Sequence, residues 1–89
     1  CGTCFDYQAF DPVQMCPINL TIRPLVVMEI SVFGERYLGL DIDSGDALDH
    51  MVMLKERCRV MNGSFTLLWH NTQLLDERKK QLYLDVLRA

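Results

Sequence analysis

A histidine follows an apolar segment near the C-terminal end of the sequence. His70 and Asn71 come directly after residues 65–69, Phe-Thr-Leu-Leu-Trp, a run typical of a buried strand. Because the ordinary pKa of an imidazole is about 6.5, His70 is suited to proton transfer near neutral pH. We therefore identify His70 as a candidate general acid, with Asn71 as a supporting polar group. The alternative is that His70 only caps the strand through a backbone hydrogen bond.

A carboxylate interrupts the other strongly apolar segment. Glu29 lies late in residues 24–33, a run that is otherwise apolar and rich in β-branched side chains. A buried carboxylate must be paired or protonated, because desolvation disfavours its charged form. Glu29 is thus a second candidate for the site. The alternative is a buried ion pair that orients a neighbour without taking part in chemistry.

Four cysteines raise the question of thiol or metal chemistry. Cys1 and Cys4 have the spacing of a redox dithiol, whereas Cys16 and Cys58 stand alone. A redox pair normally begins a helix, whose N-terminus lowers the thiol pKa, but the residues after Cys4 are typical of a loop. A zinc site requires a second close pair, which is missing. No metal ligand set is predicted in this chain.

The elements that would position His70 and Glu29 alternate between strand and helix. Residues 5–19, which contain two prolines, are expected to be irregular. Strands are expected at 24–33 and 65–69, with helices at 44–61 and 76–88. Continuous apolar strands separated by a helix favour parallel pairing in an α/β fold. Since ligands gather beyond the carboxyl ends of parallel strands, Glu29 and His70 should share one face of the sheet.

Charge and hydropathy exclude two classes of partner. Nine basic and twelve acidic residues are spread along the chain and give a net charge of −3. The one basic cluster, residues 78–80, is best explained as a solvated helix face, so no nucleic-acid partner is expected. No apolar run approaches the roughly 20 residues of a membrane-spanning helix.

Three segments together resemble a known family. They are Gly-Thr-Cys-Phe at 2–5, Pro-Leu-Val-Val-Met-Glu-Ile-Ser-Val-Phe at 24–33 and Phe-Thr-Leu-Leu-Trp-His-Asn at 65–71. They look like the closing part of NodB-type polysaccharide deacetylases, and more narrowly like a bacterial subgroup of deacetylase-like proteins. The resemblance implies a distorted TIM-like (β/α) barrel that removes acetyl groups from N-acetylated sugars. It further implies a divalent metal such as zinc held by an Asp and two His, with a second Asp as the base.

The resemblance gives each candidate residue a role. In that family a histidine of the last motif protonates the leaving amine, and His70 matches it. Glu29 falls where the subgroup has an Asp that holds an arginine of a preceding strand. Residues 1–89 would then be the C-terminal fragment of one barrel domain, with a partial (β/α) barrel fold and no cofactor of its own. Its partner would be the missing N-terminal part of that barrel, and the carbohydrate would be the substrate of the whole protein.

Without the metal ligands and the base, this chain alone is expected to be inactive. Two alternatives remain open. One is a non-catalytic barrel member that binds glycan or protein, and the other is a thiol redox module that uses Cys1 and Cys4.

Overall fold

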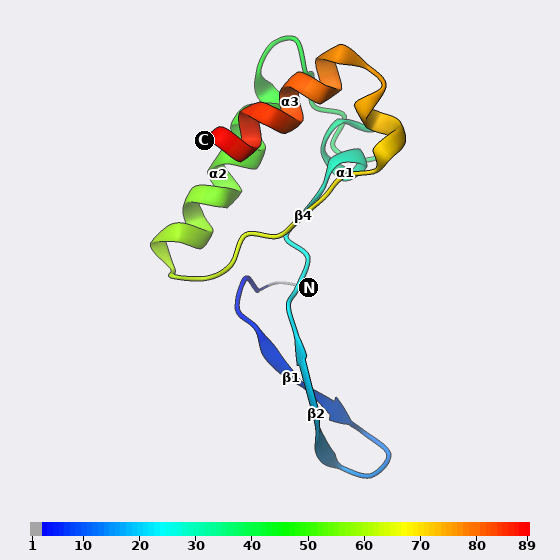
Figure 1. Ribbon diagram of the computed structural model, residues 1–89, viewed down its shortest axis with the longest axis vertical. Coiled ribbons are helices and arrows are strands. Elements are labelled where there is room, and N and C mark those ends of the chain that lie inside the picture. The colour runs from blue at the N-terminus through cyan, green and yellow to red at the C-terminus, as the bar shows by residue number, and fades with distance from the viewer. Residues whose placement is uncertain (1–2) are drawn as a thin grey trace.

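A long β-hairpin and a helical part make up the structure, a computed structural model that describes residues 3–89 (Figure 1). The radius of gyration is 15.5 Å and the extents are 49 × 27 × 20 Å. A compact domain of this length would have a radius of gyration of roughly 12 Å. The difference arises because the hairpin extends away from the helices.

The hairpin pairs β1 (Tyr7–Asp11) with β2 (Cys16–Ile22) in antiparallel orientation. Asp11 closes the turn, because its Oδ1 accepts hydrogen bonds from the backbone N–H of Val13 (2.9 Å) and of Gln14 (3.1 Å). This is an Asx turn, in which an Asp side chain replaces a backbone acceptor.

The hairpin corrects the expectation that residues 5–19 are irregular. Pro17 lies inside β2, opposite Phe10, and a two-stranded sheet tolerates it because both of its strands are edges. At the open end of the hairpin, the Arg23 guanidinium binds the Asp6 carboxylate through two hydrogen bonds of 3.1 and 3.2 Å. This pair ties the two strands together where they leave the sheet.

A second, very short sheet joins two segments far apart in the sequence. β3 (Val27–Met28) and β4 (Leu67–Leu68) run parallel, with Val27 opposite Leu67 and Met28 opposite Leu68. The backbone N–H groups of Val26 and Val27 both donate to the carbonyl of Thr66, at 3.2 and 3.1 Å. The expected parallel pairing of these two apolar segments is therefore confirmed.

Half of the first of these segments is helical, although a strand was expected across residues 24–33. After Met28 the chain forms α1 (Glu29–Phe33), which buries Glu29 and Val32. A short, continuously apolar run fits a buried helix turn as well as a buried strand. The strand therefore ends at Met28, and Glu29 becomes the first residue of a helix.

The longest helix, α2 (Asp46–Val60), carries the buried stripe that its sequence predicts. Ala47, Met51 and Cys58 are buried on one face. Asn62 adopts a left-handed conformation just beyond the helix, and the N–H of Gly63 donates to the Cys58 carbonyl at 2.8 Å. The helix expected at 44–61 is thus confirmed, and it ends close to the expected residue.

The last helix, α3 (Glu77–Arg88), follows a 3₁₀ turn at η1 (Asn71–Leu74). Asp76 caps its start by accepting a hydrogen bond from the backbone N–H of Arg78 at 2.9 Å. Lys55 of α2 caps its end, because Nζ donates to the carbonyls of Val86 and Ala89 at 2.9 and 2.8 Å. A cation at a helix C-terminus satisfies free carbonyls and complements the helix dipole.

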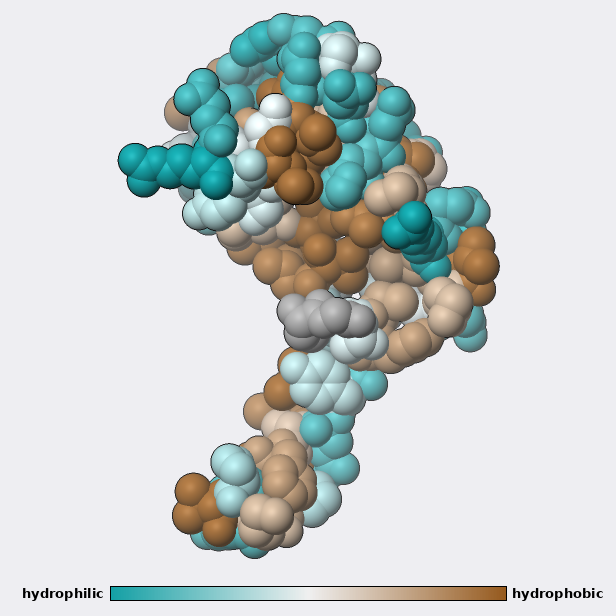
Figure 2. All heavy atoms as spheres, turned by 180° about the vertical axis from the view of Figure 1, so that it is seen from behind, coloured by the Kyte–Doolittle hydropathy of each residue, from teal (hydrophilic) through white to brown (hydrophobic). Residues whose placement is uncertain are grey.

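The core lies where the three helices meet the parallel strands. Its buried members are Val27, Val32, Ala47, Met51, Leu82 and Val86. The hairpin lies outside this core, and its side chains Phe10, Met15 and Leu20 are 52, 72 and 59% exposed. Seen from behind, apolar residues also gather on the surface of the helical part that faces the hairpin (Figure 2).

The fold class expected from the sequence, a partial (β/α) barrel, is wrong. Across residues 3–89 the sheets are one antiparallel hairpin and one two-residue parallel pair, covered by α1, α2 and α3. Strands of two residues are too short to form the wall of a β-barrel. Within the described residues, no helix combines the length and apolar character needed to cross a membrane.

We expect Met51→Ala to lower the free energy of unfolding by about 2–5 kcal/mol, because it removes a fully buried side chain from the core. Met53→Ala is the matched control, since Met53 lies on the same helix and is 37% exposed. Met53→Ala should lower the free energy of unfolding by less than about 1 kcal/mol. Urea denaturation of both variants measures the difference, and equal losses would contradict the helix orientation described above.

Candidate proton-transfer site

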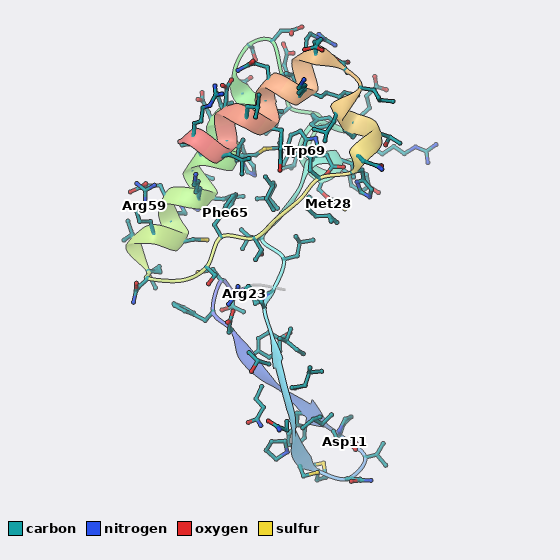
Figure 3. All side chains as sticks on the ribbon, in the orientation of Figure 1. Asp11, Arg23, Met28, Arg59, Phe65 and Trp69 are labelled. Carbon is teal, nitrogen blue, oxygen red and sulfur yellow. The ribbon has the colours of Figure 1, made fainter. Side chains whose placement is uncertain are left out.

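Glu29 and His70 meet at the carboxyl ends of the parallel strands. Met28 and Trp69, which immediately precede them, are labelled in Figure 3. The Glu29 side chain is fully buried, and its Oε1 accepts a hydrogen bond from the backbone N–H of His70 at 3.1 Å. The same oxygen is in hydrogen-bond contact with Nδ1 of the His70 ring. The expectation that the two residues share one sheet edge is therefore confirmed.

This contact fixes the orientation of the imidazole. An ionised carboxylate only accepts hydrogen bonds, so a neutral His70 must carry its proton on Nδ1 to bind Glu29. Nε2 is then the ring nitrogen that can bind a ligand or exchange a proton with it. Because the His70 side chain is 51% exposed, a ligand can approach it from the solvent side. A histidine held in this way can give or take a proton at Nε2.

The strand pairing explains why the two residues meet. The register sets Met28 opposite Leu68. Glu29 directly follows Met28, and His70 comes two residues after Leu68, so both lie just beyond the paired strands. α1 then turns Glu29 into the interior, while the chain after Leu68 stays extended through His70. The pair thus depends on β3 ending in a helix, a feature that the apolar pattern did not reveal.

Two buried polar atoms beside this contact have no hydrogen-bond partner among residues 3–89. They are Oε2 of Glu29 and Nε1 of Trp69. Leaving a buried polar group unpaired costs about 1–3 kcal/mol, and more when the group is charged. Both atoms belong to the strand ends that carry the site. The site therefore has unused hydrogen-bonding capacity for one donor and one acceptor.

An aromatic cluster forms the wall next to His70. Trp69 packs between Phe33 of α1 and Tyr83 of α3, with ring-centroid distances of 6.1 and 5.2 Å. Lys79 Nζ lies 5.3 Å from the centroid of the Phe33 ring, within the range of a cation–π contact. Trp69 therefore anchors the strand end to two helices.

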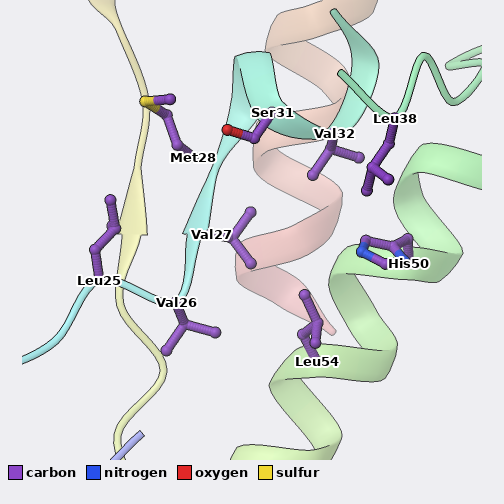
Figure 4. A pocket seen from close by; sticks show the side chains of 9 residues that line it. All are labelled: Leu25, Val26, Val27, Met28, Ser31, Val32, Leu38, His50 and Leu54. Atoms are coloured by element: carbon purple, nitrogen blue, oxygen red, sulfur yellow. The ribbon is translucent and has the colours of Figure 1, made fainter. Parts of the chain in front are cut away.

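The remaining polar candidates do not join the site. Asn71 begins η1 with an exposed side chain that makes no hydrogen bond within residues 3–89. His50 lies on α2 and lines a different, mostly apolar pocket of about 290 Å³ between that helix and β3 (Figure 4). Ser31 is the other polar residue of that lining. Of the two histidines, only His70 is paired with a carboxylate in the described part of the chain.

Of the Cys1–Cys4 pair considered as a redox dithiol, the structure describes only Cys4. Cys1 lies outside the described residues, so that prediction is not tested. Cys4 instead contacts Cys58, and burial together with this contact raises the pKa of the Cys58 thiol. Within residues 3–89 no group of three or more His, Cys, Asp or Glu side chains is placed to hold a metal ion.

Comparisons with protein-family models, with curated proteins and with solved structures found no match to this chain.

We expect neutral His70 to carry its proton on Nδ1, because Glu29 accepts there. The ¹⁵N chemical shifts of the ring, recorded above its titration, distinguish the two tautomers. Glu29→Leu fills the same buried space with a side chain that cannot accept a hydrogen bond, so it should abolish the preference. His50, whose ring has no hydrogen bond within residues 3–89, is the internal control. An Nε2-protonated His70 in the unmodified chain would contradict the assigned contact.

Proposed function

We propose that this chain supplies the proton-transfer part of a carbohydrate de-N-acetylase-like protein, in which His70 is the general acid. The observation that carries the proposal is the contact between a fully buried carboxylate, Glu29, and a half-exposed imidazole. The same histidine occupies the last motif of the resemblance, Phe-Thr-Leu-Leu-Trp-His-Asn at 65–71. Geometry and motif thus point to one residue.

The step assigned to His70 is protonation of the leaving nitrogen. When the bond between the acyl carbon and the sugar nitrogen breaks, its electron pair stays on nitrogen. That nitrogen takes the Nε2 proton of His70 in its imidazolium form, which leaves a neutral ring with its proton on Nδ1. The Nδ1–H bond to Glu29 holds the ring in place before and after the transfer. General acid catalysis of this kind contributes about 10²–10⁴-fold to a rate.

Glu29 is proposed as a positioning residue. In the resembling subgroup an Asp at this place holds an arginine, and Oε2 of Glu29 is the atom with a free lone pair in a buried position. A guanidinium donor supplied by another part of the protein would satisfy that oxygen and hold the carboxylate in its ionised, accepting form. Replacement of Asp by the longer Glu still allows the contact with His70.

The metal implied by the resemblance does not fit the described residues, because they hold no cluster of ligands for it. No step is assigned to a metal here. In the proposal, the metal ligands and the catalytic base belong to another part of the protein, and the present chain contributes His70 and Glu29. The 89-residue chain by itself is then expected to release no acetate from N-acetylated sugars.

The proposal is tested with the protein extended upstream of Cys1, assayed for acetate release from an oligosaccharide of N-acetylglucosamine. His70→Ala should lower kcat by about 10²–10⁴-fold. Glu29→Leu should also lower kcat, with a smaller change in KM, because it disturbs orientation rather than substrate binding. His50→Gln is the matched histidine control and should leave kcat within about twofold, since it contacts neither residue.

Two outcomes would overturn the enzymatic proposal. One is unchanged turnover in His70→Ala. The other is an extended protein that binds the oligosaccharide but releases no acetate with or without added divalent metal, which would favour the non-catalytic, glycan-binding alternative.

A further inference from the structure

Cys4 and Cys58 are far apart in the sequence, yet their side chains meet between the N-terminal segment and α2. The Cys4 side chain adds to burial in raising the pKa of the Cys58 thiol. Both also line one shallow, mostly apolar pocket of about 290 Å³, together with Thr3, Leu54, Arg57 and Met61. Neither thiol takes part in the proton-transfer site.

The loop after α2 holds the two cysteines together. The carbonyl of Cys58 accepts a hydrogen bond from the N–H of Gly63 at 2.8 Å, and the carbonyl of Cys4 accepts one from the N–H of Ser64, also at 2.8 Å. Successive backbone amides of one loop therefore bind both residues. Their approach is fixed by main-chain hydrogen bonds as well as by side-chain contact.

Gly63 is the residue that allows this approach. A Cβ at position 63 would meet the Cys4 sulfur and would lie 2.9 Å from the Cys4 carbonyl oxygen. Contacts this short force a neighbour to move, and here one of the neighbours is backbone. The absence of a side chain at position 63 is thus what lets Cys4 lie against the end of α2.

From this arrangement we propose that Cys4 and Cys58 form a disulfide that fastens the N-terminal segment to α2. The pairing requires an oxidant, and a low-molecular-weight disulfide is sufficient. Cys4, which is half-buried, attacks first, whereas Cys58 is only 5% exposed. The Cys4 thiolate displaces one thiolate from the oxidant and leaves a mixed disulfide.

The Cys58 thiolate then attacks the Cys4 sulfur and releases the second thiolate. Two cysteine thiols lose two electrons, the small disulfide gains them, and the two thiol protons pass to its two thiol products.

The bond would stabilise the segment that leads into β4 and then to His70. Residues 64–66 lie between the Cys4 segment on one side and Pro24–Val26 on the other, since Thr66 contacts both the Pro24 carbonyl and the Val26 N–H. A cross-link at Cys4 therefore fixes the start of the segment 64–70 without touching Glu29 or His70. It also closes a long loop, which is the condition under which a disulfide restricts the unfolded chain most.

The test treats the chain with oxidised glutathione and maps the product by mass spectrometry. Cleavage after glutamate separates residues 1–29, which contain three of the cysteines, from residues 57–77, which contain Cys58. We expect these two peptides to be joined in the unmodified chain and in Cys1→Ser and Cys16→Ser. They should be separate in Cys4→Ser and Cys58→Ala.

Two further measurements separate the proposed bond from random oxidation. The oxidised chain should melt roughly 8 °C or more above the reduced chain, because the enclosed loop is long. Gly63→Ala should slow cross-linking at least tenfold by displacing Cys4, whereas Ser64→Ala, which keeps the backbone N–H, should not. A disulfide between Cys1 and Cys4 in the unmodified chain, or free thiols at positions 4 and 58 after oxidation, would overturn the proposal.

Discussion

A fully buried carboxylate must find hydrogen-bond donors, and this requirement governs the centre of the structure. Glu29 obtains two donors from one residue, the backbone N–H and the ring of His70. Both are available only if the chain after β4 stays extended beside the start of α1. The register of the parallel strands, the end of β3 at Met28 and the inward turn of α1 are therefore linked. A one-residue shift between the strands would leave the carboxylate buried without a partner.

The sequence predicted this neighbourhood from two local features. Apolar runs before Glu29 and before His70 indicated buried, parallel segments, and the carboxyl-end rule placed the two polar residues on one edge. The helix expected at 44–61 is present at 46–60. Each of these features depends on residues within a few positions of one another, so it can be recognised from a single sequence.

The features that the sequence did not predict depend on contacts between distant residues. The barrel was an expectation of the family resemblance. The apolar runs predicted two full strands, yet each run contributes only two residues to the sheet. The hairpin was missed because Pro12 and Pro17 indicated a loop, and nothing local indicated that Asp6 binds Arg23 or that Asp11 closes the turn. Likewise, nothing local indicated that the buried Cys58 lies beside Cys4, which is near the other end of the chain.

The described residues orient His70 but do not enclose it. Glu29 fixes the ring from the buried side through its carboxylate. Trp69, the preceding residue, anchors the backbone by packing on Phe33 and Tyr83. The other side of the ring faces solvent, where water competes for Nε2 and weakens any charge interaction. Acid catalysis is strongest where water is excluded. Acid catalysis by His70 would thus require a surface that covers the carboxyl ends of β3 and β4 and excludes water from the imidazole.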